Sequence, residues 1–346
     1  MTSDRLTIYE QMQFSQLYNK GFNWNNFIKE NGGNYCQLLN WKEIIFKTYQ
    51  LEPLYLVIAN EHLEALGVFS AMRLPWPLHS KAVSMPYCNY GGFAFKSNIS
   101  SSAKSICIDY LGANGIHFLE TRELGDGGSS SEVAMYRNLP ETEGQLWSSV
   151  GDKLRNQIRK SQKYGFEICW GRNQVDSLYE VYAINMGRLG TPVHSKLFIQ
   201  NIVDSFQENC NILTISHLGE VISAMLVIKF GSIWADPIAS SKFEFRSQNV
   251  NMLLYWEAFK AGIKEGVSMF DLGRSSRFSG TYNFKRQWGS YELPIRCGMY
   301  VDGIFTNSSS VNFYRGSIAK FSSKIWNKLP FQVQKNFGPI IRRYMP

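Results

Sequence analysis

The sequence has 346 residues, of which 44% are hydrophobic, 14% aromatic and only 18% charged, with a net charge of +8. This length exceeds that of an ordinary domain, so we expect two domains. The apolar content excludes intrinsic disorder, and no segment approaches the roughly 20 apolar residues that a membrane span needs. Because the first ten residues are polar and unlike a signal peptide, the sequence predicts a soluble, cytoplasmic protein.

The positive charge is concentrated at the end of the chain. Residues 303–346 contain no Asp or Glu but seven cations: Arg315, Lys320, Lys324, Lys328, Lys335, Arg342 and Arg343. Because the remainder is nearly neutral, a general nucleic-acid-binding surface is not indicated.

The six cysteines and five histidines are widely dispersed, without a CxxC or HExxH spacing. We therefore expect reduced, mostly buried thiols and no metal site.

Similar patterns recur along the chain about 155 residues apart. A predicted hairpin is followed in each half by a helix, a glycine and a strand that leads into an acid. The first set spans 54–59, 66–72, 102–114 and 116–122, and the second spans 212–216, 221–230, 249–265 and 267–270. The shared offset predicts a duplicated α/β unit, although such patterns are common enough to coincide by chance.

Between the halves, residues 141–164 show a long helical pattern. One face carries Leu146, Val150, Leu154 and Ile158, while Lys153, Arg155, Arg159, Lys160 and Lys163 occupy the other faces. The basic side chains either form a solvated face or line a cleft for an anionic substrate. We divide the chain into a first domain (1–145), a bridging helix (146–165), a second domain (166–300) and a basic helical tail (301–346).

The densest chemistry lies in Met269–Gly289, MFDLGRSSRFSGTYNFKRQWG. Cations are interleaved there with aromatic residues: Arg274, Arg277, Lys285 and Arg286 with Phe278, Tyr282, Phe284 and Trp288. Such a segment suits a phosphate or diphosphate in a partly dry groove. It is equally a basic loop whose aromatic side chains belong to the core. The GxSxG, Walker and GxGxxG motifs are absent, which disfavours nucleophilic hydrolases and nucleotide-binding folds.

The same segment closely resembles the carboxyl-terminal signature of FemAB-like acyltransferases. Supporting pieces occur in order: WKEIIFKTYQLEPLYL, SMPYCNYGGF, LRNQIRKSQKYG and NVNMLLYWEAFKAGIKEG. The resemblance extends from about Trp24 to the end and is greatest to the branch associated with exopolysaccharide and cell-envelope gene clusters. It implies two tandem GNAT-like domains, each a mixed, mainly antiparallel sheet flanked by helices.

The resemblance also implies the reaction, which is transfer of an acyl or aminoacyl group to an amine. In this family the lysine of the FK motif, here Lys285, lies at the acceptor's phosphates. We expect Arg274, Arg277, Arg286, Tyr282 and Trp288 to complete or shape that substrate site. The acceptor would be a phosphate-bearing or lipid-linked saccharide.

The donor is left open by residues 246–251, RSQNVN. Acetyl-coenzyme A users of the wider superfamily have a [Q/R]xxGx[G/A] loop at this place, whose backbone N–H groups meet the pyrophosphate. Here Arg246 is present, but Asn249 and Asn251 replace both glycines, which hinders close backbone approach. We expect no tightly bound cofactor, and either acyl-coenzyme A or aminoacyl-tRNA as the donor.

Acyl transfer also needs a proton acceptor. The candidates are Asp271 and Glu120, which end equivalent strands, and His194, which we expect on a solvated loop. Asp271 is alternatively a structural partner of Arg274.

In the tail, Tyr314, Ile318, Phe321, Ile325 and Leu329 form one apolar helical stripe that Lys320, Lys324 and Lys328 border, before Pro330. The stripe fits either peripheral contact with an anionic inner membrane face or packing on the protein itself.

We therefore expect an N-acyltransferase for an envelope or exopolysaccharide precursor. The alternatives are an aminoacyl-tRNA-dependent peptidoglycan or peptide aminoacyltransferase, and a non-catalytic binding module with the same fold.

Overall fold

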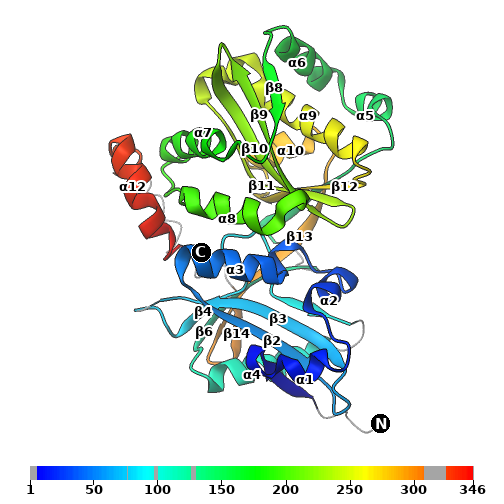
Figure 1. Ribbon diagram of the computed structural model, residues 1–346, viewed down its shortest axis with the longest axis vertical. Helices are drawn as coiled ribbons and strands as arrows, with labels where there is room; N and C mark the ends of the chain where they lie inside the picture. Colours follow the sequence, from blue (N-terminus) through cyan, green and yellow to red (C-terminus); the bar gives the residue numbers. More distant parts are fainter. Residues whose placement is uncertain (1–5, 76, 97–99, 126–129, 308–324, 346) are drawn as a thin grey trace. The chain divides into compact units, whose positions relative to one another are not determined.

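The computed structural model describes residues 6–75, 77–96, 100–125, 130–307 and 325–345 (Figure 1). The chain forms two compact units. Within the described residues, unit 1 comprises the chain up to residue 130 together with 294–307, and unit 2 comprises 131–293 and 325–345.

These bounds differ from the division at residues 145 and 300 that we expected. Residues 132–138 pair with residues 269–276 and so belong to unit 2. Residues 295–301 pair with residues 118–124 and so return to unit 1. The predicted bridging segment lies within unit 2.

The sheet of unit 1 has the strand order β1-β2-β3-β4-β6-β13, with β5 beside β3 and β14 beside β13. Its strands pair antiparallel except β4 and β6, which are parallel. The elements are β1 (Thr7–Glu10), η1 (Gln11–Gln13), α1 (Phe14–Tyr18), α2 (Trp24–Glu30), η2 (Tyr35–Gln37), α3 (Leu39–Tyr49), β2 (Glu52–Ala59), β3 (Ala65–Arg73), β4 (Lys81–Val83), β5 (Phe93–Phe95), α4 (Ser100–Ala113), β6 (Phe118–Leu124), β13 (Tyr291–Val301, from residue 294 in this unit) and β14 (Ile304–Asn307).

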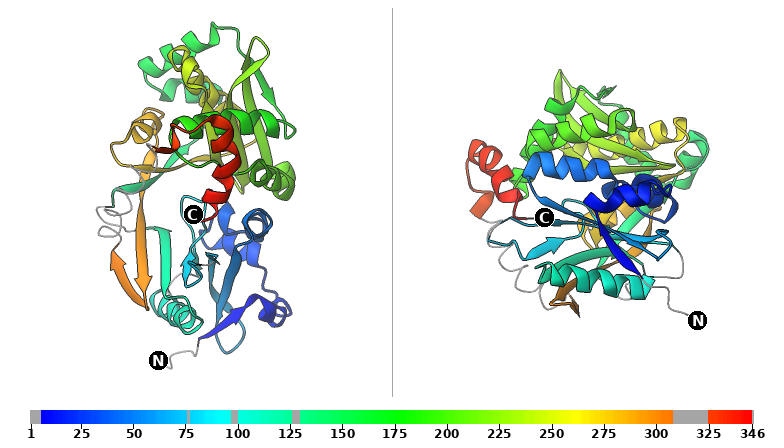
Figure 2. Two further views of the ribbon diagram at one scale, coloured as in Figure 1. Left: turned by 90° about the vertical axis from the view of Figure 1, so that its left-hand side faces the viewer. Right: turned by 60° about the horizontal axis from the view of Figure 1, so that its bottom comes forward.

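Helices cover both faces of this sheet (Figure 2). Successive strand residues point to opposite faces. Leu56 of β2 packs in one core with Cys107 and Leu111 of α4. Its neighbour Tyr55 faces the other way, and its ring centroid lies 4.9 Å from that of Trp24 in α2.

The sheet of unit 2 has the order β7-β12-β11-β10-β9-β8, and only β11 and β12 are parallel among the strand pairs described. The elements are β7 (Glu132–Asn138), α5 (Glu143–Ser149), α6 (Asp152–Gln162), β8 (Glu167–Trp170), α7 (Val175–Arg188), α8 (Lys196–Phe206), η3 (Gln207–Asn209), β9 (Cys210–His217), β10 (Glu220–Phe230), β11 (Ile233–Ser241), η4 (Phe243–Gln248), α9 (Val250–Lys264), β12 (Met269–Ser276), α10 (Gly280–Arg286) and α12 (Phe331–Arg342). The main core packs α6 and α9 against one face of the sheet, while α7 contacts β10 and β11.

The long helix expected over 141–164 is two helices, α5 and α6. Val150 has extended backbone angles (φ −99°, ψ 148°), and Gly151 starts α6 in a similar conformation. The apolar stripe is nonetheless confirmed, because Leu146, Leu154 and Ile158 are all buried in the core of unit 2. The break allows both helices to place the same stripe on the sheet.

The predicted duplication is confirmed by the strand pairing. The hairpin β2–β3 corresponds to β9–β10, and α4 followed by β6 corresponds to α9 followed by β12. In each unit the parallel pair has three positions, ending at Val83–Glu120 in unit 1 and at Ala235–Asp271 in unit 2.

The expectation of reduced thiols is wrong for one pair of cysteines. Cys36 of η2 and Cys88, both buried, form a disulfide across 52 residues of sequence, with their Cα atoms 6.4 Å apart. Folding brings these distant positions together, which their spacing in the sequence cannot show. In the described part of the chain, the other four cysteines, Cys107, Cys169, Cys210 and Cys297, form no disulfide.

Among the described residues, no group of three or more His, Cys, Asp or Glu side chains is placed to hold a metal ion. The described helices include none that is long and apolar enough to cross a bilayer.

Most of the predicted tail stripe, from Tyr314 to Phe321, lies outside the described residues. The structure shows α12 after Pro330, beyond the predicted stripe but within the segment 301–346 that we expected to be helical. α12 packs on unit 2, where a side chain at Gly338 would meet the backbone of Val193, and Lys335 lies 5.4 Å from the Tyr179 ring.

Candidate active site

In unit 2 the two parallel strands separate soon after they meet. The last paired position joins Ala235 to Asp271. β11 then bulges, because Asp236 and Pro237 stand opposite Val227 alone on β10. Pro237 has no N–H to donate, which disfavours further pairing on this strand.

β12 bulges at the same level. Leu272 and Gly273 stand opposite Met135 alone, and Gly273 has a φ of 72°. Glycine adopts this left-handed conformation without steric cost. The Asp271 carboxylate accepts a hydrogen bond from the Gly273 N–H at 2.8 Å, which fixes the bulge. The two strands therefore diverge and open a gap in the ladder.

Asp236 lies at the point of divergence. Its Oδ2 accepts a hydrogen bond from the Tyr255 hydroxyl of α9 at 2.6 Å. Its Oδ1 is shielded from solvent and has no hydrogen-bond partner among the described residues. Burial raises the pKa of Asp236 to about 7, against the opposing effects of Tyr255 and Lys285. A carboxyl group that titrates near neutral pH suits general base catalysis.

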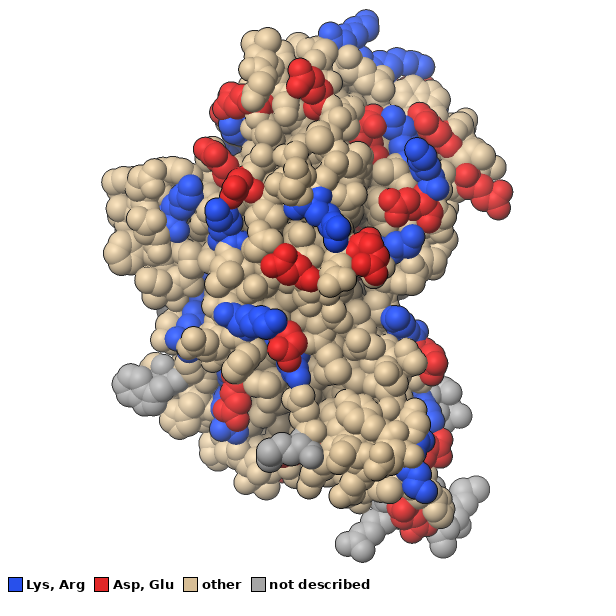
Figure 3. All heavy atoms as spheres, viewed as in Figure 1, with Lys and Arg blue, Asp and Glu red and all other residues tan. Residues whose placement is uncertain are grey.

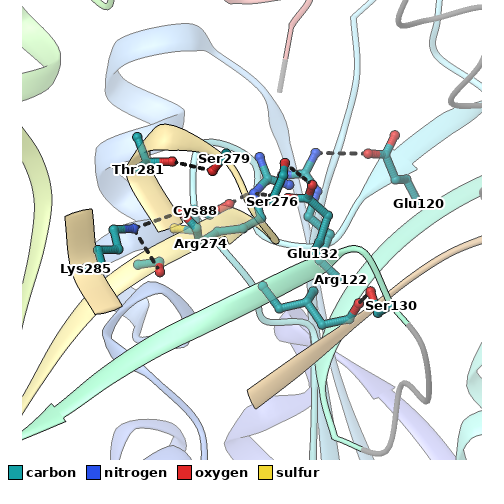
Figure 4. Close-up of polar contacts among 12 residues, drawn as sticks. Cys88, Glu120, Arg122, Ser130, Glu132, Arg274, Ser276, Ser279, Thr281 and Lys285 are labelled. Atoms are coloured by element: carbon teal, nitrogen blue, oxygen red, sulfur yellow. Dashed lines mark hydrogen bonds and ion pairs between the residues drawn. The ribbon is translucent and has the colours of Figure 1, made fainter. Parts of the chain in front are cut away.

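Lys285 is buried under the β12 bulge. Its ammonium group donates hydrogen bonds to the carbonyls of Gly273 at 3.2 Å and Arg274 at 2.9 Å (Figure 4). Burial lowers the pKa of Lys285, while Asp236 and Asp271 act in the opposite direction. Lys285 thus joins α10 to the diverging strand, and its predicted contact with an acceptor phosphate stays a prediction.

The other cations of the predicted groove differ in their surroundings. Arg274 faces Glu132 at 3.6 Å, and Arg277 pairs with Glu292 at 3.0 Å. Ser276 also hydrogen-bonds to Glu132, as Figure 4 shows. Arg286 is exposed at the end of α10.

Among the aromatic residues of this segment, Trp288 belongs to the core. It is fully buried, and its ring lies edge-on to Phe259 with centroids 5.0 Å apart. Trp288 therefore shapes the segment from inside instead of facing a groove. Tyr282 is partly buried against the same core.

The carboxylates of the other two candidate acids, Glu120 and Asp271, already have partners within the protein. Glu120, in unit 1, pairs with Lys81 and with Arg122, each at 2.9 Å, and Figure 4 shows the Arg122 contact. Asp271 holds Gly273, as described above. β6 continues beyond Glu120 and β12 continues beyond Asp271. Only their parallel pairing, with β4 and β11 respectively, ends at these acids.

His194 is not on a solvated surface, contrary to our expectation. It is buried, lies parallel to the Phe198 ring with centroids 4.3 Å apart, and accepts a hydrogen bond from Arg342 of α12 at 3.1 Å. Burial, followed by the charge of Arg342, lowers the pKa of His194 well below its usual value.

The loop predicted to bind the donor connects β11, one of the two diverging strands, to α9. Arg246 is exposed in η4, and Asn249 precedes α9 in the left-handed conformation with a φ of 56°. Asparagine tolerates this conformation better than most residues that replace glycine. Asn251 interacts with the Ser241 hydroxyl at 3.3 Å.

Sequence reasoning missed Asp236 and Tyr255. The available signal was an Asp-Pro dipeptide inside an otherwise apolar strand, a place where proline marks a bulge or an edge. No sequence pattern marks Tyr255 of α9, whose hydroxyl is the partner of Asp236.

Unit 1 has the same divergence without the carboxylate. Ser84 follows the last β4–β6 pair, and its hydroxyl accepts a hydrogen bond from the Arg122 N–H at 3.1 Å. The strand resumes only at β5, after residues 84–92, whose Gly91 N–H bonds to the Arg122 carbonyl. This loop occupies the opening that remains in unit 2.

Residues 148–286 match the family model of the acetyltransferase (GNAT) domain. The match begins in α5 and ends with α10, so it includes β11, β12, Asp236 and Lys285. The matched segment is a GNAT-type domain. No curated protein matches the sequence significantly.

Solved structures extend the similarity to both units. FemX is 14% identical with a TM-score of 0.61, over 84% of this chain and 96% of FemX. The C-terminal domain of a putative lysylphosphatidylglycerol synthetase from Agrobacterium fabrum is 9% identical with a TM-score of 0.55, over 80% of this chain and 90% of that domain. A tandem GNAT protein from the clavulanic acid biosynthesis pathway is 8% identical with a TM-score of 0.54, over 87% of this chain and 99% of that protein.

At these identities the structural matches concern the fold. They confirm the predicted pair of tandem GNAT-like domains, and the family model identifies the second of these as an acetyltransferase (GNAT) domain.

Proposed function

We propose that the GNAT domain of unit 2 transfers an acyl or aminoacyl group to the amine of a phosphate-bearing saccharide precursor, at the divergence of β11 and β12. The observation that carries the proposal is the Asp236 carboxyl group, which combines a pKa of about 7 with an oxygen that lacks a partner among the described residues.

In the proposed reaction, the acceptor nitrogen attacks the donor carbonyl carbon, an amide bond forms, and the donor's sulfur or oxygen leaves. Asp236 Oδ1 accepts the proton that the amine loses. The Tyr255 pKa is raised well above its usual value by burial and then by Asp236, so its hydroxyl stays protonated and holds Oδ2. Beyond Ala235, backbone carbonyl groups of β11 can accept hydrogen bonds from an extended donor chain, while Pro237 offers no N–H to it.

We propose that Arg246, Asn249 and Asn251, at and before the start of α9, bind the part of the donor that is remote from its acyl group. A pyrophosphate at this place would point to acyl-coenzyme A. The similarity to a protein named as a lysylphosphatidylglycerol synthetase supports keeping an aminoacyl donor in the tests.

For the acceptor, the segment around α10 supplies Arg274, Arg277 and Arg286, with Tyr282 beside them and Lys285 beneath. Because Arg274 and Arg277 already face carboxylates, a phosphate would have to compete with Glu132 and Glu292. Arg274 and Arg286 are exposed, whereas Arg277 is partly buried.

For the place of reaction, we propose contact of α12 with an anionic membrane surface. α12 exposes Phe337, Ile340 and Ile341, and the exposed Tyr344 follows the helix at the next position of the same spacing. The surface over α12 in Figure 3 (left) is mostly uncharged, whereas both signs of charge are interspersed elsewhere on the visible face. No acidic residue follows Asp302 to oppose the basic residues around this stripe.

The test is turnover by the purified protein with acetyl-coenzyme A or lysyl-tRNA as donor and glucosamine 1-phosphate as acceptor. Asp236→Asn should lower kcat/KM by about 10²–10⁴-fold. The wild-type kcat/KM should fall as the pH drops below about 7, since protonated Asp236 cannot accept a proton. Asp271→Asn is the matched comparison. If the decrease of kcat/KM at low pH disappears in Asp271→Asn and persists in Asp236→Asn, Asp271 is the base. Absence of turnover with both donors would favour a binding module.

A further inference from the structure

Unit 1 contains a pocket of about 480 Å³ beside the loop that fills its strand divergence. Its lining includes Asn31 after α2, Phe93 and Phe95 of β5, Lys104 of α4, Glu123 of β6 and Arg296 of β13. This volume lies in the usual range of small-molecule sites. β6 contributes, as does β5, the strand that resumes after this loop, so the pocket lies next to the divergence of unit 1.

One wall carries a fixed ion pair. The Lys104 ammonium donates to both oxygens of Glu123, at 2.8 and 2.6 Å, and both side chains are about four-fifths buried. Arg296 stands opposite Glu123 on the neighbouring strand. Each carboxylate oxygen keeps a further acceptor site and the ammonium keeps a third N–H, which together suit a hydroxyl group that both donates and accepts.

The second wall is aromatic. The rings of Phe93 and Phe95 are nearly parallel, with an angle of 13° and centroids 5.4 Å apart. Lys104 lies 5.1 Å from the centroid of the Phe93 ring. The electron-rich faces of such rings favour contact with the polarised C–H groups of a sugar ring.

The third wall is held rigidly by contacts between η2 and the loop 84–92. Besides the Cys36–Cys88 disulfide, Asn34 donates to the Tyr90 carbonyl at 3.1 Å and Gln37 to the Gly92 carbonyl at 3.2 Å. A wall fixed before binding reduces the entropy lost when a ligand is ordered.

The charges of the lining argue against a strongly anionic ligand. Among its described residues the charged ones are Lys104, Glu123 and Arg296, and Glu123 neutralises its partner. A diphosphate here would meet a carboxylate. Hydroxyl partners beside parallel aromatic faces favour a neutral or weakly charged sugar.

We propose that this pocket of unit 1 binds a sugar ring of the acceptor. The identification of the ligand as an acceptor sugar rests on the proposed function, whereas the binding itself does not require catalysis. The pocket would select the saccharide, and the GNAT domain of unit 2 would carry out the transfer.

The test is titration of the full chain with D-glucosamine and N-acetyl-D-glucosamine in the absence of any donor, followed by calorimetry or ligand-observed NMR. Saturable binding is expected, and Glu123→Gln should weaken it about tenfold or more, as for loss of a charge-assisted hydrogen bond. Phe95→Leu, which keeps an apolar side chain, should weaken it about threefold. Glu64→Gln, which removes a carboxylate paired with Lys96 elsewhere in unit 1, should change nothing.

The idea is overturned if neither sugar binds saturably, if Glu123→Gln and Glu64→Gln have equal effects, or if uridine binds and the sugars do not. Asp236→Asn separates this idea from the proposed function, because it should lower kcat/KM by about 10²–10⁴-fold and leave sugar binding unchanged. An active wild-type enzyme that binds neither sugar would refute the pocket and leave the proposed function standing.

Discussion

At the scale of single residues, Asp236 shows how a reactive group can cost stability. Its pKa is about 7 in the folded chain and 3.8 in its ordinary state, so the folded state holds the proton more tightly. The stability that this group contributes is therefore present at acid pH and is lost as the pH rises from about 4 through 7. The same burial prepares the carboxylate for catalysis.

Asp236→Asn should consequently raise Tm at pH 8, where the wild-type carboxylate is charged, by roughly 2–4 °C for each kcal/mol recovered. At pH 5 the difference should nearly vanish, because Asp236 is then neutral. Thermal unfolding at both pH values is the measurement, with Asp176→Asn, an exposed aspartate paired with Lys196, as the control. Equal Tm shifts for the two variants at pH 8 would contradict the assigned environment.

Lys285 needs an experiment that separates structure from binding. Lys285→Met leaves the Gly273 and Arg274 carbonyls without these bonds, so a lower Tm is expected, by an amount equivalent to about 1–3 kcal/mol. If Lys285 also meets the acceptor phosphate, kcat/KM should fall at least about tenfold more for glucosamine 1-phosphate than for glucosamine. Equal losses for both acceptors would restrict Lys285 to holding β12.

These two residues also show what the sequence can predict. Lys285 stands in a recognisable motif, so its position near the site followed from resemblance. Asp236 acquires its pKa only from burial under α9 and α10, which join the site from distant parts of the chain. No local pattern encodes that desolvation, and we selected Glu120 and Asp271 because they are equivalent in sequence.

At the scale of elements, periodic patterns predicted the hairpins and the stripe of α5 and α6, because burial of apolar faces decides both. The break at Val150 was missed, since one extended residue leaves the stripe spacing unchanged. Residues 84–92 were not recognised as an insertion into a strand. β4 and β5 both pair with β3, so they are two halves of the element that β11 forms without interruption.

The attachment of α12 should depend on pH through His194. Its folded-state pKa lies well below 6.5, so the stability that it contributes is present above pH 6.5 and is lost as the pH falls below that value. Protonation of His194 removes the acceptor for Arg342 and places two cations together.

We expect hydrogen-exchange protection of residues 331–342 to fall between pH 7.5 and pH 5.5, relative to that of α9. The measurement is exchange monitored by mass spectrometry, with rates corrected for the intrinsic effect of pH. His194→Gln should make the protection less dependent on pH, while His62→Gln, on an exposed side chain, should not. Unchanged protection of α12 in the wild type would show that other contacts hold the helix.

At the scale of the whole molecule, the two units have kept one topology and differ in what occupies the strand divergence. Unit 2 has an aspartate there with one shielded carboxylate oxygen, and unit 1 has an inserted, disulfide-linked loop beside a polar and aromatic pocket. The duplication could be predicted from a shared sequence offset, since offsets survive when residues change. The division of roles could not, because it depends on side chains that meet only after folding.

The proposed membrane contact concerns the exposed face of α12. The apolar stripe of α12 and the acid-free sequence around it predict binding to anionic vesicles that weakens as salt rises, since each cation near the leaflet contributes about 1 kcal/mol. Phe337→Ser combined with Ile340→Ser should reduce co-sedimentation with phosphatidylglycerol vesicles about tenfold or more, because two apolar side chains no longer enter the interface. Leu218→Ser, at a side chain that is 91% exposed in the β9–β10 turn, is the matched control and should bind like the wild type. If the wild type stays in the supernatant at low salt, or if the stripe variant sediments as fully as the control, α12 is a structural helix and the acceptor is met in solution.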